Sequence, residues 1–147
     1  MPERLNLREL VELLDDGRRF YESAAENVRG KELESLFQRM AHTKAAIAGA
    51  LNARLRARGE PPASDGTLLG HLRQGLAEIR AQFSSAPDAT YVEQLERFED
   101  RMRDAFREAA GESVDAETRL LAAKYLPDVL RDHSEMSALK RQLRSAG

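Results

Sequence analysis

The sequence predicts a single all-α domain over residues 1–147, built as a four-helix bundle, and three observations support this prediction. Four long segments carry apolar residues at helical spacing along one face. These apolar stripes are about three residues in seven wide, the width that bundle helices show. A length of 147 residues with 41% hydrophobic content suffices for one domain with a full core.

The first two helices are expected over residues 7–28 and 32–57. Asn6 is a suitable N-cap, and a Glu three residues later completes a capping box. A short turn with Gly30 in a left-handed conformation makes the two helices antiparallel neighbours. Gly17 interrupts the apolar face of the first helix. Because a mid-helix Gly costs about 1 kcal/mol against Ala, we expect a neighbouring element to approach closely there.

A crossover is expected between the second and third bundle helices. It consists of a Pro- and Gly-rich linker over residues 58–65, an additional helix over 67–83 and a second break over 84–89. At about 1.5 Å per residue this helix is about 25 Å long, nearly the length of a bundle. It can therefore carry the chain from one end to the other and leave the bundle helices on either side of it parallel. Ferritin-like bundles have crossovers of this kind.

The last two helices are expected over residues 91–110 and from about 116 to 143. Either Ser113 or Asp115 caps the final helix. Pro127 lies inside that helix, and an interior proline removes a hydrogen bond. Two alternatives stay open: the proline kinks one helix, or it begins the second of two shorter ones.

One charged residue on each of these four helices points inward at a similar height. Glu99 lies in the middle of an apolar stripe, where an ionised carboxylate costs several kcal/mol unless it is paired. Arg18, Lys44 and His133 lie at the same level. The sequence therefore predicts a buried polar layer in which Glu99 pairs with Arg18 or Lys44. His133 is expected to bond to Glu99 or Tyr125.

A metal centre is the alternative interpretation of this layer. Di-iron bundles use a Glu on each of two helices and a Glu-x-x-His on each of the other two. Neither His42 nor His133 has a Glu three residues before it. The candidate ligands are therefore limited to Glu22, Glu99 and His133, and the two cations of the layer would repel a divalent ion. We expect no resident cofactor.

The composition excludes several classes of function. A net charge of −2 and a pI near 6.0 offer no basic surface for nucleic acid. The sequence contains no apolar run long enough to span a membrane, and its start lacks the apolar core of a signal peptide. With no Cys there is no disulfide or thiolate chemistry, and we expect a cytoplasmic protein. The pair Asp15–Asp16 and the residues His42 and His71 are expected to be solvated.

A set of short motifs spans nearly the whole chain. They are Leu5-Asn6, Leu10-Val11, Asp16-Gly17, Tyr21, Ala24-Ala25, Leu36-Phe37, Gly59, Gly66, Glu96, Glu99, Tyr125 and His133. In order and spacing this set resembles an uncharacterised bacterial family of ferritin-like four-helix-bundle proteins that carry a domain of unknown function and are related to stress-induced ferritin-like proteins. The resemblance implies a ferritin-like fold with a helical crossover, often in a homodimer, and no established reaction.

Two functions from different classes follow from these patterns. The first is a non-enzymatic bundle with a degenerate metal site, no catalytic residues and a stress-related or partner-binding role, self-associating as a homodimer. The second is a ferritin-like di-metal (Fe or Mn) oxidase or iron-handling protein that uses Glu22, Glu99 and His133. An apolar ligand held between the helices is a third interpretation.

Overall fold

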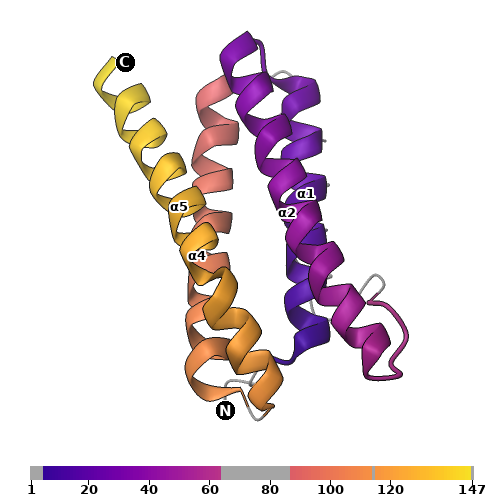
Figure 1. Cartoon of the computed structure of the whole chain (residues 1–147). Coiled ribbons are helices and arrows are strands. Elements are labelled where there is room, and N and C mark those ends of the chain that lie inside the picture. The colour runs from indigo at the N-terminus through magenta and orange to yellow at the C-terminus, as the bar shows by residue number, and fades with distance from the viewer. Residues whose placement is uncertain (1–4, 64–86, 114, 147) are drawn as a thin grey trace.

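The computed structural model describes residues 5–63, 87–113 and 115–146. Within these ranges the chain forms four long α-helices and no strand, so the predicted all-α four-helix bundle is confirmed. Figure 1 shows the four helices side by side along one axis. Their bounds are α1 Leu7–Asn27, α2 Lys31–Ala57, α4 Asp88–Glu112 and α5 Ala116–Ala146. The helix expected over 67–83 lies outside the described residues.

The start of α1 is fixed by the capping box expected from the sequence. The Asn6 side chain accepts a hydrogen bond of 2.9 Å from the backbone N–H of Glu9. The Glu9 carboxylate in turn accepts one of 3.4 Å from the backbone N–H of Asn6. Two of the N–H groups that a helix start leaves unpaired are thereby satisfied, so the helix begins where the sequence predicts.

The turn between α1 and α2 differs from the prediction in its conformation. Gly30 has φ of −72°, so it is not left-handed and serves as the N-cap of α2. The turn is held from outside by Asp88, the first residue of α4. Its carboxylate accepts hydrogen bonds from the backbone N–H groups of Arg29, at 2.8 Å, and Gly30, at 2.9 Å. The Asp88 side chain thus stabilises the turn, whereas the sequence-based prediction attributed it to a left-handed conformation of Gly30.

The helices α2 and α4 are parallel, as the predicted crossover requires. Asp88 joins the start of α4 to the start of α2. At the other end, Arg58 follows the last residue of α2, and its Nη1 lies 2.5 Å from Oδ2 of Asp115, just beyond the end of α4. In Figure 1 α1 and α5 run in the opposite direction to α2 and α4. The bundle therefore consists of two antiparallel hairpins, α1–α2 and α4–α5.

The final helix is continuous through Pro127, so the alternative of two shorter helices is wrong. Asp115 caps its start, because Oδ1 accepts hydrogen bonds from the backbone N–H groups of Glu117, at 3.0 Å, and Thr118, at 3.4 Å. A proline in the interior of a helix gives up one backbone hydrogen bond. Packing of the helix along α4, its most extensive neighbour, compensates for this loss.

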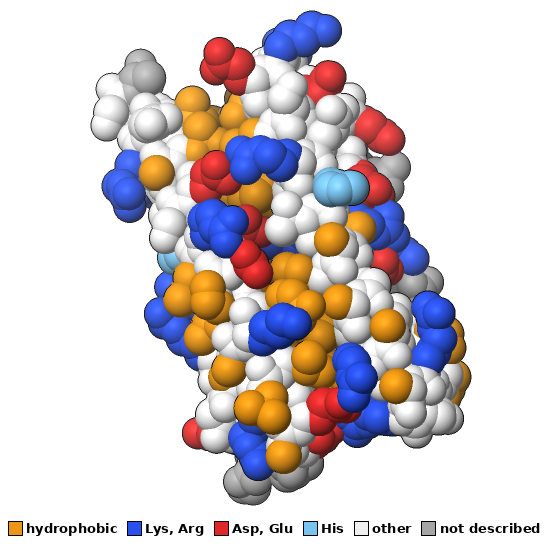
Figure 2. All heavy atoms as spheres, viewed as in Figure 1, with side chains coloured by type: hydrophobic (Ala, Val, Ile, Leu, Met, Phe, Trp, Pro, Cys, Tyr) orange, Lys and Arg blue, Asp and Glu red, His pale blue; other side chains and the backbone are white. Residues whose placement is uncertain are grey.

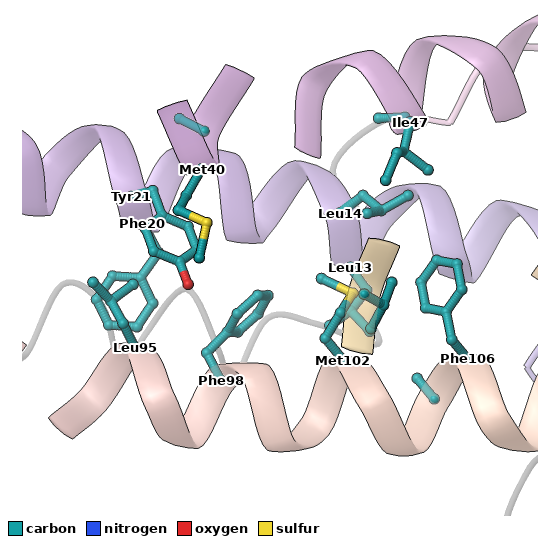
Figure 3. Packing of buried hydrophobic residues seen from close by; sticks show 14 of the residues in the cluster. Leu13, Leu14, Phe20, Tyr21, Met40, Ile47, Leu95, Phe98, Met102 and Phe106 are labelled. Atoms are coloured by element: carbon teal, nitrogen blue, oxygen red, sulfur yellow. The ribbon is translucent and has the colours of Figure 1, made fainter. Parts of the chain in front are cut away.

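The core lies between the two hairpins. Phe20 of α1 packs edge-on against Phe98 of α4, with ring centroids 6.2 Å apart, and Figure 3 shows both rings between the two helices. The hairpins approach closely at Gly17, where a Cβ atom would lie only 2.6 Å from Cε1 of Phe98. The expected close approach at this glycine is therefore present. No helix in the described ranges has the length and hydropathy needed to cross a membrane.

Candidate functional site

A buried ion pair lies at the centre of the bundle. Glu99 is 0% exposed in the middle of the apolar stripe of α4, and Lys44 of α2 is 1% exposed. The Lys44 ammonium lies 3.2 Å from Oε1 and 3.0 Å from Oε2 of Glu99. Of the two cations that the sequence offered to Glu99, the structure therefore brings Lys44 to it.

Two further residues, neither of them predicted from the sequence, complete this group. Asp132 of α5 accepts a hydrogen bond of 2.9 Å from the Lys44 ammonium. The hydroxyl of Tyr21, on α1, donates to Oε2 of Glu99. The ammonium also lies 5.6 Å from the centroid of the Tyr21 ring, within the range of a cation–π contact. We call these four residues the central network: Tyr21, Lys44, Glu99 and Asp132.

Each of the four described helices contributes one residue to the central network. The network contains one cation, two carboxylates and one neutral hydroxyl. Burial raises the pKa of Glu99, although the nearby Lys44 charge opposes this. Burial alone would lower the pKa of Lys44, but the two carboxylates beside it raise the value above its ordinary range. Burial and Glu99 together raise the pKa of Tyr21 well above normal, so Tyr21 stays neutral and Lys44 charged at pH 7.

Arg18 does not reach this network, which corrects the sequence prediction. Its guanidinium Nη2 lies 2.8 Å from Oδ1 of Asp15, and its Nη1 lies 2.7 Å from Oε1 of Glu22. Both partners are on the same helix, three residues before it and four after it. These are the spacings at which helical side chains meet. Arg18 is half-buried and pairs with two carboxylates at the edge of the core. The guanidinium therefore avoids the desolvation cost of entering the core.

His133 is also placed differently from the prediction. It forms no hydrogen bond with either of its expected partners, Glu99 and Tyr125. Its Nε2 lies 2.6 Å from Oδ1 of Asp100 and 3.1 Å from Nη1 of Arg103, both on α4. The side chain is half-buried on the outer side of the α4–α5 contact rather than in the bundle centre. Its neighbour Asp132 is the α5 residue that reaches the bundle centre.

The three candidate metal ligands Glu22, Glu99 and His133 are not brought together. The side chain of Glu22 is 51% exposed and pairs with Arg18. Across the described ranges, the one group of three acidic or histidine side chains with ligand atoms within 4.8 Å of one another is Glu96, Asp100 and His133. It shares only His133 with the predicted set.

Two predictions about solvated residues have different outcomes. Asp16 is 1% exposed, so its expected place on a solvated face is wrong. It lies on the inner half of α1, immediately before the glycine that lets the two hairpins approach. His42 is exposed on α2, as expected, and His71 lies outside the described residues.

Residues 4–112 of the chain match a protein family described as "Domain of unknown function (DUF2383)". The chain belongs to this family. The DUF2383 match covers α1, α2 and α4, and with them three residues of the central network: Tyr21, Lys44 and Glu99. It ends at the last residue of α4, so Asp132 and His133 lie beyond it. A search of curated proteins finds no match.

The central network of this DUF2383 protein holds a cation that is part of the chain. Two carboxylates bind the Lys44 ammonium at distances of about 3 Å. A buried amine in this position neutralises one carboxylate charge and links α2 to both α4 and α5. With Tyr21 bound to Glu99, the same group also reaches α1. The arrangement is suited to fixing the four helices relative to one another.

Proposed function

We propose that this DUF2383 protein is a non-enzymatic, self-associating helical bundle that acts through contacts with partner molecules in a stress-related role. The observation that carries the proposal is the Lys44 ammonium between Glu99 and Asp132. Di-iron bundles place metal ions among inward carboxylates at this depth. Here a covalently attached cation takes that position.

The energetics of the central network support this proposal. A metal ion bound by Glu99 and Asp132 would have to displace an ammonium that is almost fully buried. Breaking a buried ion pair costs about 3–5 kcal/mol, because the separated charges are left without compensation. Among the described residues the amine contacts Tyr21, Glu99 and Asp132, and all three are buried. The network is thus better suited to holding the helices than to exchanging ions.

The edge between α2 and α5 is the surface that we propose for self-association. These two helices touch less than the partners within each hairpin do. Ion pairs bridge the edge on either side of the Lys44–Asp132 contact. They are Arg39–Glu135, at 3.0 Å, and Arg54–Glu117, at 2.5 Å.

Apolar side chains lie beside these ion pairs. Leu121 and Leu139 each follow, by four residues, a glutamate of α5 that bridges to α2, so they lie on the same face of the helix. Both are half-buried against the core, as is Leu36 of α2. Figure 2 shows hydrophobic side chains gathered between charged ones on this face. A mixture of apolar and charged groups is typical of surfaces that bind other proteins.

The first test measures metal binding and oxidation at the bundle centre. Protein is incubated anaerobically with Fe(II), desalted and analysed for iron by mass spectrometry. A parallel sample is exposed to oxygen and followed for Fe(II) oxidation. We expect no oxidation above a protein-free blank. Two irons per chain that are lost in Glu99→Gln would contradict the proposal and support the di-metal oxidase instead.

A second test measures self-association by sedimentation at several protein concentrations. We expect a dimer that Leu139→Glu weakens. The matched control is Leu126→Glu, because Leu126 is also half-buried on α5 but lies five residues after Leu121, on another face. Circular dichroism verifies that both variants remain folded. A wild-type protein that is monomeric at all concentrations, or equal effects of the two variants, would refute the proposed surface.

A further inference from the structure

We propose that Glu96, Asp100 and His133 form a binding site for a single divalent transition-metal ion, of which Zn²⁺ is the representative. The site lies on the outer side of the α4–α5 contact and shares no residue with the central network. Its three ligand atoms are within 4.8 Å of one another. All three side chains are half-buried, so they are held in place and can still be reached from solvent.

The two helices bring these ligands together through simple geometry. Glu96 and Asp100 are four residues apart on α4 and therefore lie on one face, one turn apart. His133 comes from α5, which packs along that face. One imidazole nitrogen and two carboxylate oxygens form a donor set suited to Zn²⁺ and other divalent transition metals. The two carboxylates also supply the negative charge that a divalent cation needs.

The hydrogen bonding of His133 provides a second, independent observation. Its Nε2 lies 2.6 Å from Oδ1 of Asp100 and 3.1 Å from Nη1 of Arg103. An ionised Asp100 only accepts hydrogen bonds, whereas Arg103 only donates them. One ring nitrogen cannot serve both, because it either carries a proton or offers a lone pair. The hydrogen bonds within the cluster therefore leave one of these contacts unsatisfied. A metal ion between Nε2 and the carboxylate would satisfy both ligands and release Arg103.

The two cations near the site, Arg103 and Lys140, are only loosely held there. Besides its contacts with His133, at 3.1 Å, and with Oδ1 of Asp100, at 3.7 Å, Arg103 donates through Nε to Oδ1 of Asp104, at 3.1 Å, on the solvent side of α4. Lys140 reaches Glu96 only at 3.4 Å, and it is half-buried rather than enclosed. This differs from the centre of the bundle, where Lys44 is enclosed on all sides. A metal ion can displace loosely held surface cations at a much smaller cost than a buried one.

A neighbouring hydroxyl orients one ligand. The Oγ of Ser137, one turn after His133 on α5, donates to Oε2 of Glu96 at 3.3 Å. This leaves Oε1 as the oxygen that faces the metal once Lys140 withdraws. Hydrogen bonds of this kind position metal ligands and strengthen their binding. Three protein ligands leave a fourth tetrahedral position for water. The bound ion would cross-link α4 to α5.

The test is a titration of chelator-treated protein with ZnCl₂ by isothermal calorimetry, with the stoichiometry taken from native mass spectrometry. We expect one Zn²⁺ per chain and a higher thermal midpoint in its presence. His133→Ala should abolish binding. Asp100→Asn removes the charge of a second ligand and should weaken binding by more than about tenfold, the loss typical of changing even an outer-shell partner. The matched control is His42→Ala, because His42 is exposed on α2 and should bind as wild type does.

Cobalt provides a spectroscopic test of the same site. Co²⁺ added to the apo protein should give the visible absorption of a tetrahedral complex, and this absorption should be lost in His133→Ala. No binding by the wild type, undiminished binding by both ligand variants, or loss in His42→Ala would overturn the proposal. Asp100→Asn changes a side chain that is 42% exposed, so it keeps the test valid if His133→Ala fails to fold. Since this site does not include Glu99, its failure would leave the proposed function of the bundle untouched.

Discussion

Replacing Lys44 by Met removes the cation at the centre of the bundle and keeps a side chain of similar length. In the variant Glu99 keeps its hydrogen bond from the Tyr21 hydroxyl, and Asp132 loses the ammonium. Both carboxylates are buried. The perturbation therefore tests whether this residue neutralises charge or merely fills space, since Met fills the same volume without the charge.

The expected cost follows from the burial of the pair. Lys44 and Glu99 are almost completely inaccessible, so solvent cannot screen or replace their interaction. Removing one partner of a buried ion pair costs about 3–5 kcal/mol. This is a large part of the 5–15 kcal/mol or so that stabilises a typical domain. Because the penalty comes from the unpaired charges, the triple variant with Glu99→Gln and Asp132→Asn should recover much of the stability.

The loss should also depend on pH, with a sign that the pKa of Glu99 determines. Burial raises this pKa in the folded protein, and removing Lys44 removes a charge that lowers it. A raised carboxyl pKa means that the folded state holds the proton more tightly than the unfolded chain does. Stability is then highest below the ordinary pKa of about 4.3 and falls as the pH rises through the folded value. The deficit of Lys44→Met should be smaller near pH 5 than near pH 8.

Urea unfolding followed by far-UV circular dichroism measures this deficit at both pH values. Wild type and the triple variant serve as references. A cost below about 1 kcal/mol, the value for an exposed ion pair, would show that the network is not buried as described. A larger cost that is the same at both pH values would show that packing, not charge, is responsible.

Three further predictions concern packing, capping and alkaline stability. Gly17→Ala should destabilise the protein by about 1–3 kcal/mol, because the new methyl group would lie 2.6 Å from an aromatic ring atom of α4. At Gly49 an added Cβ meets no atom within 4 Å, so Gly49→Ala should instead stabilise the protein by up to about 1 kcal/mol. Thermal unfolding of both variants checks this, and stability changes of the same sign would contradict it. Asp88→Ala removes the acceptor of two backbone N–H groups at the start of α2. The free energy of unfolding measured in urea should fall by about 1–2 kcal/mol. An unchanged midpoint would show that water replaces the carboxylate. Stability should fall above about pH 10, because the raised pKa of Tyr21 means that the unfolded chain loses this proton before the folded protein does. Tyr21→Phe should lessen the fall by up to about 1.4 kcal/mol per pH unit. Identical alkaline stability profiles of the variant and the wild type would refute this.

Much of the fold could be predicted because it depends on short-range patterns. Asn6 and the apolar periodicity give the start and the buried face of α1 without any knowledge of its neighbours. Gly17 was informative for a similar reason, since a residue that weakens its own helix requires compensation from another. The contact between Lys44 and Glu99 could be anticipated because both lie on apolar stripes, where an unpaired charge is too costly to persist.

The rest of the central network could not be predicted, for reasons of angle and reach. On α5, positions 132 and 133 lie on opposite edges of the stripe that Val129 and Met136 define, and helical spacing alone does not decide between Asp132 and His133. Tyr21 has an apolar body, so its stripe position reveals the ring but not the partner of its hydroxyl. Arg18 has a side chain long enough to leave the core face for carboxylates on its own helix.

The central network also has a consequence for the alignment of the helices. An apolar layer tolerates displacement along the helix axis, since one leucine or alanine contact resembles the next. A slip of one turn, about 5.4 Å, would carry Lys44 past Glu99 and leave three charges facing apolar side chains. Such misaligned bundles would be several kcal/mol less stable than the native one. The four polar residues therefore fix the axial register of the helices. They favour the native arrangement over displaced arrangements that bury almost as much apolar surface.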